Sequence, residues 1–545
     1  MEIGTGTEIS TAYERLNEEW RKTTSVLLGE ELGELRNYEK WLLDLKQPRL
    51  KLRSAVSGNE AVFSSPDYSP AAKAVCLDEL VNVQSSAQLS SNEIKDIDSL
   101  FGALRERFYY CGNIILGNSQ FVEKSSSITD SFYVYESARI NGSRNIAYTT
   151  ISKVCENLFG CNVGSFCNYA IRCHQFGRGA RLFEAWLTWR SSGCYYTYNL
   201  MGCEECFFSF NLRGKRYAIG NRVLPREQYA SIKAGLLEQL ADIIKQKKSA
   251  PSMADIINGC GAPSREEIAQ LAAFATFAKP SETHFGMQPI EDAFSKTSKL
   301  IFGKPLSGSV CDYAGWLKRH IIDVGEIESV LGSGKIPVPN YENYRVLIKN
   351  RYVGITEAEK MGEGLKISEQ EAERLNFSNT SEILGPIAYI SSQFRDGNVL
   401  NVSDSPIVIS SSDCHSVLGC VNVKDSAFCT WPNGSEYVFG CAFAFNSKFS
   451  MKCYNSVNLT GCFEVDSSSC STYDYFCHNV ENVHDSMFCF NAKNLRYAIG
   501  NNIVGMEQYQ RAKSMLQIWL IEKLEKNKAV NEDIFNICSV KLSNG

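Results

Sequence analysis

The sequence predicts an α+β protein that is a tandem duplication of one unit: a helical and mixed segment, then a parallel β-solenoid (β-helix), then a C-terminal capping helix. Three observations predict this class. Residues 210–221 return as residues 490–501, 280 positions later. Residues 111–221 and 396–501 lose helical periodicity and show short strand-like stretches separated by frequent turn signals. Cysteines recur throughout both of these regions.

The repeat covers most of each half of the chain. The offset of 280 holds without a gap from Gly160 and Gly440 to the closing stretch, and upstream it drifts to 275, where Trp41 matches Trp316. Loops of unequal length explain such a drift. We therefore expect four parts: an N-terminal helical and mixed region at 1–110, a first solenoid with its capping helix at 111–262, a second helical and mixed region at 263–395, and a second solenoid with its capping helix at 396–545.

The helices are expected from apolar spacing and from capping residues. Residues 8–46 carry apolar side chains at spacings of three and four, and Pro48 closes this segment. A serine three residues before a glutamate predicts a capping box, in which the two residues satisfy each other's backbone N–H groups. Such boxes begin at Ser90, Ser264 and Ser368. The segments after residues 227 and 507 each carry one apolar face, and these are the expected capping helices.

The solenoid interpretation depends on residue size and spacing. Cysteines in the second region are separated by 6 to 12 residues, and the recurring polar motifs indicate coils of roughly twenty residues. Cysteine, serine, valine and asparagine are small enough to stack inside such coils. The last coil would expose an unpaired strand edge, which a capping helix can cover. The alternative is a β-sandwich, whose strands alternate without stacking like residues.

Composition favours an ordinary globular protein. Of the 545 residues, 44% are hydrophobic and 21% are charged, and the net charge is −5, so no strongly basic nucleic-acid footprint is present on the scale of the whole chain. The sequence shows no run of eighteen apolar residues and no secretory signal, so we expect no membrane segment and a cytoplasmic location. Its 21 cysteines are expected to be reduced thiols that pack as small buried groups. The alternative is a disulfide-rich interior of the kind found in hyperthermophiles.

One set of residues has the composition of a metal site. Cys203 and Cys206 form a Cys-x-x-Cys pair, with Cys194 upstream and His174 further back. Four such ligands could hold zinc in a tetrahedral site. The second half has Val483 and Ser486 where the first has the cysteine pair, so any metal would belong to the first half alone. We expect these cysteines to be buried thiols without metal and the protein to have no cofactor, and zinc binding by these four residues is the alternative.

Three histidines and two glutamates are the candidates for catalysis in the sequence. His174, His415 and His478 each follow a cysteine. Neighbouring side chains in a strand point to opposite faces, so we expect the thiol inside and the imidazole outside. Glu184 and Glu464 occupy equivalent places, and a carboxylate pair would suit glycoside chemistry on a solenoid. We expect both to be solvated surface acids, and a role in glycoside chemistry is the alternative.

A basic and aromatic patch recurs at the end of each solenoid. Its residues are Lys215, Arg216 and Tyr217 in the first copy and Lys493, Arg496 and Tyr497 in the second. Such a patch could hold a phosphate or the acidic surface of a partner. The alternative is that these cations guard the edge of a sheet against aggregation.

The segment around the first patch resembles a known group of sequences. Cys203-x-x-Cys206, then residues 211–213, Tyr217 and Tyr229, is similar to a pattern in cysteine-rich, uncharacterised, solenoid-like proteins of small-genome archaea and candidate-phylum bacteria. The similarity covers about thirty residues well, and the second half departs from it by lacking the Cys-x-x-Cys pair. This resemblance implies the architecture, and it carries no activity.

These observations favour a non-catalytic structural or interaction protein. Two similar modules would form a rigid, pseudo-twofold scaffold, a subunit of a larger assembly or a factor bound to one, and two similar surfaces favour bivalent binding. We therefore expect a protein partner or self-assembly, and no clear nucleic-acid partner. Two alternatives from other classes are a carbohydrate-active solenoid enzyme and a zinc- or iron–sulfur-binding protein.

Overall fold

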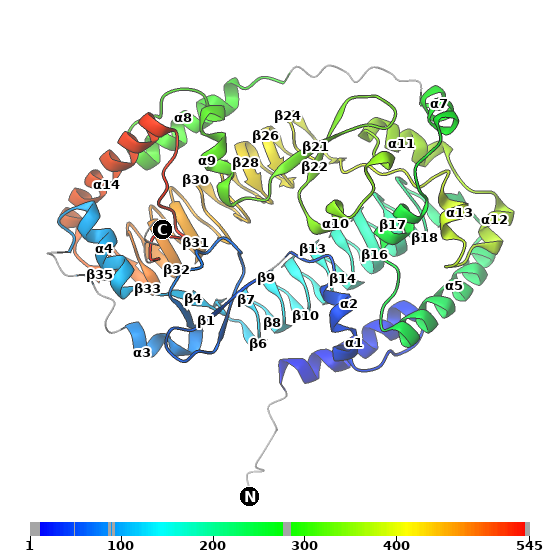
Figure 1. Ribbon diagram of the computed structural model, residues 1–545, viewed down its shortest axis with the longest axis horizontal. Helices are drawn as coiled ribbons and strands as arrows, with labels where there is room; N and C mark the ends of the chain where they lie inside the picture. Colours follow the sequence, from blue (N-terminus) through cyan, green and yellow to red (C-terminus); the bar gives the residue numbers. More distant parts are fainter. Residues whose placement is uncertain (1–10, 48, 85–88, 90–92, 276–284, 540–545) are drawn as a thin grey trace, which may run out of the picture.

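The computed structural model describes residues 11–47, 49–84, 89, 93–275 and 285–539. Within these ranges the protein is mixed α/β, with fourteen α-helices and a large, mainly parallel sheet of sixteen strands (Figure 1). Sheets of eight and three parallel strands follow in the second half. None of the helices in these ranges has the length and apolar composition needed to cross a bilayer.

We refer to the parallel strands of residues 115–219 as the first ladder and to those of residues 394–496 as the second ladder. The strands of the first ladder are β5 (Ile115–Leu116), β6 (Gln120–Glu123), β7 (Ser126–Thr129), β8 (Phe132–Tyr135), β9 (Ala138–Asn141), β10 (Arg144–Ala147), β11 (Thr150–Lys153), β12 (Glu156–Phe159), β13 (Asn162–Ser165), β14 (Asn168–Ile171), β15 (His174–Gly177), β16 (Ala180–Trp189), β17 (Ser192–Tyr198), β18 (Glu204–Phe207) and β19 (Arg216–Ile219). Those of the second are β23 (Phe394–Asp396), β24 (Leu400–Ser403), β25 (Ile407–Ile409), β26 (Ser412–Leu418), β27 (Cys420–Val421), β28 (Lys424–Thr430), β29 (Glu436–Phe439), β30 (Lys448–Met451), β31 (Phe463–Ser469), β32 (Tyr475–His484) and β33 (Phe490–Arg496).

Strand pairing repeats every twelve residues in both ladders. In the first, Arg144 of β10 lies opposite Phe132 of β8 and Glu156 of β12. In the second, Cys414 of β26 lies opposite Ser426 of β28. The expected coil of about twenty residues is therefore wrong, because paired residues lie twelve positions apart, or thirteen in the pairs β5–β7 and β23–β25.

A period of three residues underlies this pairing. From Ser127 to Gly220 every third residue has a positive φ, including the β-branched residues Ile151 and Val154 at +66° and +53°. The interior cluster of the first ladder consists only of residues that directly follow one of these positions. Lys215, which follows Gly214 at the end of the ladder, is an exposed exception. A left-handed residue costs an L-amino acid about 1–2 kcal/mol, so the parallel pairing and the packed interior must offset a large backbone cost.

Small polar side chains inside the ladder complete the hydrogen bonding between strands. The hydroxyl of Ser143 accepts the N–H of Cys155 at 3.0 Å and donates to the carbonyl of Asn141 at 2.9 Å. Ser137 does the same for Thr149 and Tyr135. A thiol has a similar size and donates weakly, which explains why cysteines replace serines further along the same columns. Eighteen of the 21 cysteines are buried.

Helices cover both ladders at equivalent places. α1 (Ala12–Leu28) packs on the first ladder, where Trp20 meets Phe159 with ring centroids 5.3 Å apart. α8 (Gln288–Phe302) packs on the second through Phe302 and Phe463 at 5.2 Å. The capping helices α5 (Arg226–Lys247) and α14 (Met506–Asn527) begin 280 residues apart and have 22 residues each.

The remaining helices only partly follow the sequence expectation. The helix expected over residues 8–46 is interrupted after α1, and α2 (Glu39–Leu43) follows. The capping boxes at Ser264 and Ser368 are confirmed and begin α7 (Arg265–Phe274) and α12 (Glu369–Arg374). The box at Ser90 lies outside the described residues. The other helices are α3 (Leu80–Gln84), α4 (Ile97–Arg107), α6 (Met253–Gly259), α9 (Ala314–Leu317), α10 (Glu342–Arg345), α11 (Ile355–Gly364) and α13 (Thr380–Leu384).

The segment that precedes each ladder packs on the opposite ladder. We call the described part of residues 49–112 the first arm and residues 321–393 the second arm. Asn491 of the second ladder donates to the carbonyl of Tyr109 in the first arm at 3.0 Å. Asn211, next to the first ladder, donates to the carbonyl of Tyr389 in the second arm at 2.8 Å. Donor and acceptor are both displaced by 280 residues between these two bonds, so the same contact is made twice and in opposite directions.

Other contacts extend this exchange of arms. In the first arm, Phe101 of α4 meets Phe488 and Trp519 of the second half, at 5.9 and 5.4 Å between ring centroids. In the second arm, Phe377 meets Tyr196 of the first ladder at 5.3 Å. Figure 1 shows the outcome: α4 lies beside α14 at one end of the molecule, and α12 and α13 lie beside α5 at the other. The buried core is continuous across both halves.

The hydroxyl columns make a testable contribution to stability. Ser143→Ala leaves the buried N–H of Cys155 without its acceptor, so we expect the free energy of unfolding to fall by about 1–3 kcal/mol. Ser143→Cys retains a weak acceptor of similar shape and should cost less. Urea unfolding followed by circular dichroism measures both. The exposed Ser231→Ala in α5 is the matched control, and equal effects of all three substitutions would contradict this role.

Candidate functional site at the caps and the seam

The predicted metal ligands lie in two different environments. Cys194 of β17 pairs in register with Cys206 of β18, and Cys203 lies directly before β18. The thiols of Cys203 and Cys206 donate to the carbonyls of Met201 and Glu204 at 3.5 and 3.6 Å. All three cysteines are fully buried inside the first ladder. The Cys-x-x-Cys spacing therefore coincides with the three-residue period of inward-facing positions.

His174 is separate from this group of thiols. Its ring packs against Trp186 with 4.8 Å between ring centroids, on the outside of the ladder, while Cys173 faces inward. This arrangement is the one that strand alternation predicts. In the ranges that the structure describes, no group of three or more histidine, cysteine, aspartate or glutamate side chains is placed to hold a metal. Zinc binding by the four predicted residues stays a prediction.

The two basic and aromatic patches form equivalent surfaces. The Arg216 guanidinium lies 5.8 Å from the ring centre of Tyr217, and that of Arg496 lies 4.9 Å from the ring centre of Tyr497. Each tyrosine then packs on the first tyrosine of its capping helix, at 5.6 Å in the first copy and 5.8 Å in the second. The strand edge, the patch and the capping helix are thus one packed unit at both ends.

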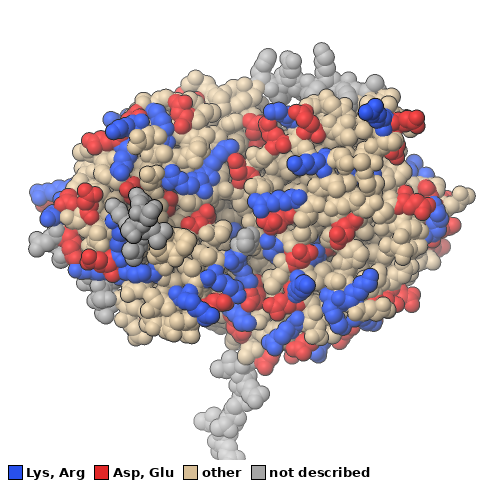
Figure 2. All heavy atoms as spheres, viewed as in Figure 1, with Lys and Arg blue, Asp and Glu red and all other residues tan. Residues whose placement is uncertain are grey.

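Acids of the preceding strand partly compensate the charge of each patch. Arg216 pairs with Glu204, twelve residues earlier, and Lys493 pairs with Glu481 at 2.6 Å with the same separation. Arg496 lies 3.5 Å from Asp485. Lys215 is exposed. Figure 2 shows the same intermixing of both signs over the visible face of the molecule, where cations and acids alternate.

Glu184 and Glu464 are not solvated surface acids, as both are fully buried. Glu184 pairs with Arg172, and its other oxygen accepts the N–H of Met253 at 3.0 Å. Glu464 lies 3.5 Å from Lys452, and its other oxygen accepts the N–H of Ile534 at 3.1 Å. Burial raises the pKa of Glu464 to about 7, although Lys452 opposes this shift.

The cation of each pair also bonds to the helical region of its own half. Arg172 donates to the carbonyl of Trp41, and Lys452 donates to that of Trp316 at 3.1 Å. Each cation also lies 5.3 Å from the ring centre of the same tryptophan. One buried ion pair in each half therefore joins the helical region, the ladder and the segment after the capping helix. Sequence comparison between the halves identified the acids, but not their cations, because one is arginine and the other lysine.

A buried polar cluster joins the first arm to the second ladder at the seam, the region where the two ladders face each other. The Cys111 N–H donates to Nε2 of His478 at 3.1 Å, so the ring proton is on Nδ1, which faces Asp466 at 3.3 Å. Tyr68 donates its hydroxyl to the same carboxylate. Burial raises the pKa of Tyr68 well above its usual range, which keeps the hydroxyl a donor.

A second cluster at the seam surrounds His320. Its Nε2 lies 2.9 Å from Asp533, and its Nδ1 lies 3.3 Å from Asp67 of the first arm. His320 and Asp67 border a cavity of about 120 Å³, together with Arg139 of the first ladder and Asn455 of the second. Burial lowers the pKa of His320, but the two carboxylates outweigh burial, and the net shift is upward.

No family model, curated protein or solved structure matches this chain.

The buried ion pair between Arg172 and Glu184 can be tested because the second half uses lysine in place of this arginine. Arg172→Met leaves Glu184 without its cation, and we expect a loss of about 3–5 kcal/mol in unfolding free energy. Arg172→Lys reproduces the pair that the second half uses and should cost much less. Denaturant unfolding of the two variants measures this difference, and an equal loss for both would contradict the assignment of the pair.

His320 should make stability depend on pH. Because its folded pKa is raised above that of the unfolded chain, its contribution is complete below about pH 6.5 and is lost as pH rises through the folded pKa. The charged groups that face it are Asp67, Asp533, Arg319, Arg139, Lys452 and Glu464. Urea unfolding between pH 6 and 8 should show a larger decline for the wild type than for His320→Gln. Parallel declines would refute the contribution of His320.

Proposed function

We propose that this protein is a non-catalytic structural or interaction protein: a rigid, pseudo-twofold scaffold that serves as a subunit or binding factor of a larger assembly. The observation that carries this proposal is the reciprocal exchange of arms. Asn211 and Asn491 make equivalent hydrogen bonds into opposite halves, and one buried core spans both. Two modules held in this way keep a fixed separation, which is the property that a scaffold needs.

We further propose that each ladder is a β-solenoid and that the two halves arose by duplication. The pairing period of twelve residues and the inward residue in every third position support the first point. The equivalent helices, ion pairs and crossing bonds at an offset of about 280 residues support the second. A ladder of this kind offers its outer faces and capped ends to partners, because its interior is filled by side chains.

The two capped ends are the proposed contact surfaces. Each presents an arginine over a tyrosine beside the end of a capping helix, and Lys215 and Lys493 extend the basic character of the two ends. Because the two ends are similar and rigidly linked, a partner that contacts both binds with the avidity of two sites. An acidic protein surface has the chemistry that such ends would recognise.

Charge reversal at the capped ends tests this function. Native purification of the tagged chain, followed by measurement of the complex mass, should give a defined assembly larger than the 60.9 kDa chain. Reversal at one end should weaken the assembly, and reversal at both should abolish it. The substitutions are K215E and R216E at one end and K493E and R496E at the other, with K40E and K349E as controls at exposed lysines elsewhere.

The wild-type mass and the control variant together decide the outcome. If the wild type elutes at the mass of the single chain, or if the doubly reversed variant keeps the same assembly, the capped ends are not the contact surfaces. If the control variant loses the assembly as well, a non-specific charge effect explains the result, and the proposal fails.

A further inference from the structure

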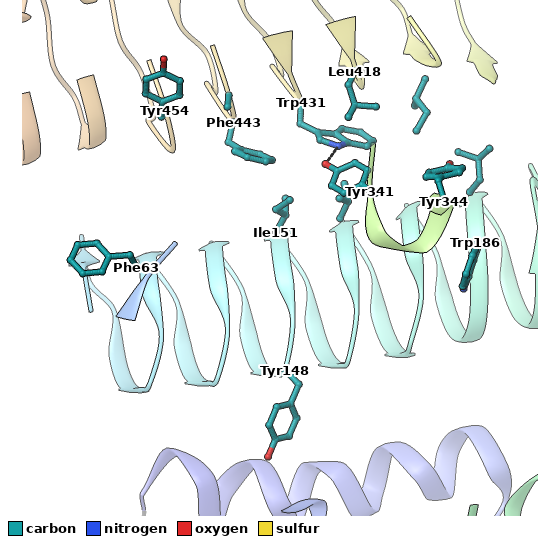
Figure 3. Packing of buried hydrophobic residues seen from close by; sticks show 14 of the residues in the cluster. Phe63, Tyr148, Ile151, Trp186, Tyr341, Tyr344, Leu418, Trp431, Phe443 and Tyr454 are labelled. Atoms are coloured by element: carbon teal, nitrogen blue, oxygen red, sulfur yellow. Dashed lines mark hydrogen bonds between the residues drawn. The ribbon is translucent and has the colours of Figure 1, made fainter. Parts of the chain in front are cut away.

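A pocket of about 200 Å³ lies at the seam, with walls from both ladders. The first ladder contributes Ile151, Lys153 and Trp189, and the second contributes Trp431 and Phe445. Figure 3 shows Ile151 and Trp431 pointing from opposite ladders into the space between them, and the hydrogen bond of 2.7 Å from the Trp431 indole to the Tyr341 hydroxyl. This pocket is distinct from the capped ends and from the cavity beside His320.

Each tryptophan of the pocket lies against a glycine that precedes it by twelve residues, on the neighbouring strand turn. Gly177 lies opposite Trp189 in the ladder, and a Cβ on this glycine would lie 2.3 Å from the indole ring. Gly419 precedes Trp431 by the same twelve residues, and a Cβ there would also lie 2.3 Å from the ring. The two ladders thus leave room in the same way for one flat indole, and both indoles line the same pocket.

Several hydrogen-bond donors of the pocket have no acceptor within the described protein. The Trp189 side chain is 7% exposed, and its buried indole N–H has no partner among the described residues. The Lys153 ammonium lies 4.7 Å from the ring centre of Phe445. In the described ranges neither this ammonium nor the Arg178 guanidinium forms an ion pair or a side-chain hydrogen bond. A buried donor without an acceptor is costly, so the Trp189 N–H favours a ligand that offers an acceptor. Lys153 is half-buried and Arg178 is exposed, so these two cations are accessible to an anionic group.

The charge of the pocket is positive. Its lining includes Lys153, Arg178 and Arg190, and the one acid of the lining is Asp396. The Arg190 guanidinium forms an ion pair with the Asp396 carboxylate, with 2.8 Å between nitrogen and oxygen. Two cations therefore remain for a ligand, beside broad aromatic walls. Mostly apolar walls with a few convergent polar groups are typical of small-molecule sites.

We propose that the seam pocket binds a small anionic ligand with a planar aromatic ring. The ring stacks on an indole wall, as planar rings do on tryptophan. The anionic group bonds to Lys153 and Arg178, because a charge-assisted hydrogen bond is about twice as strong as a neutral one. The Trp189 N–H donates to a ligand acceptor. This proposal goes beyond the scaffold function and does not depend on it, because the residues involved lie away from the capped ends.

Four probes separate the parts of this chemistry. AMP carries a ring and a phosphate, indole-3-carboxylate a ring and a carboxylate, adenosine a ring alone, and inorganic phosphate an anion alone. Titration by calorimetry of the full chain should show saturable binding of AMP, of the carboxylate or of both. Adenosine and phosphate should bind at least about tenfold more weakly, which corresponds to about 1.4 kcal/mol. The stronger of the first two probes identifies the anion that the pocket takes.

Variants of the cations locate the binding. Lys153→Met combined with Arg178→Gln should weaken the better probe by at least about tenfold, while Lys153→Arg keeps the charge and should retain most of the binding. Lys366→Met, outside the pocket, is the matched control, and thermal unfolding confirms that each variant is folded. The proposal is overturned if neither ring-bearing anion binds saturably at millimolar concentration, if adenosine binds as tightly as AMP, or if the double variant binds like the wild type.

Discussion

The structure depends on how the two ladders hydrogen-bond the N–H and C=O groups of their own backbone. Every third residue adopts a left-handed conformation, and side chains as large as Tyr148 and Arg172 do so at φ of +53° and +54°. Such a backbone is unfavourable for an L-residue in isolation. It persists because the chain returns after twelve residues to pair with itself, and because small hydroxyl and thiol groups bridge successive strands. The abundance of serine and cysteine follows from this constraint, since larger or purely apolar side chains could not make these bonds.

The ladders in turn determine how the two halves are joined. Their capped ends and outer faces are the surfaces left for packing, and each receives the arm of the other half. The close approach of Gly220 to Ile367 and of Gly500 to Leu89 illustrates this, because a Cβ at either glycine would lie within 2.5 Å of the opposing side chain. Neither half completes its own capped end, so the two modules form one body.

The sequence predicted the strand-rich regions and the helices α5 and α14, because the signals for these elements are local and recur in both halves of the chain. It did not predict the coil length, although the signal was present. Interior residues such as Val134, Ile140 and Ile146 are six positions apart. Counting these apolar residues together with the cysteines gives a period that divides twelve, which the cysteine intervals alone do not show. The same period accounts for the Cys-x-x-Cys spacing that indicated zinc.

Other features could not be predicted from the sequence. The exchange of arms joins residues such as Tyr68 and His478, which are about 400 positions apart and belong to no shared pattern. The cations buried with Glu184 and Glu464 differ between the halves, so comparison of the repeats conceals them. The seam pocket forms between the two ladders, so it has no local sequence signal. The role of Gly177 and Gly419 is seen only in the structure, where a tryptophan ring packs against each of them.

Native-state hydrogen exchange, measured by mass spectrometry on the intact chain, tests most directly whether the two ladders form one body. If the contacts of each arm with the opposite ladder make the two halves unfold together, the slowest-exchanging amides of both ladders have the same opening free energy. That value equals the free energy of global unfolding. If one ladder exchanges completely while the other remains protected, the halves open independently, and the account of a single locked scaffold is wrong.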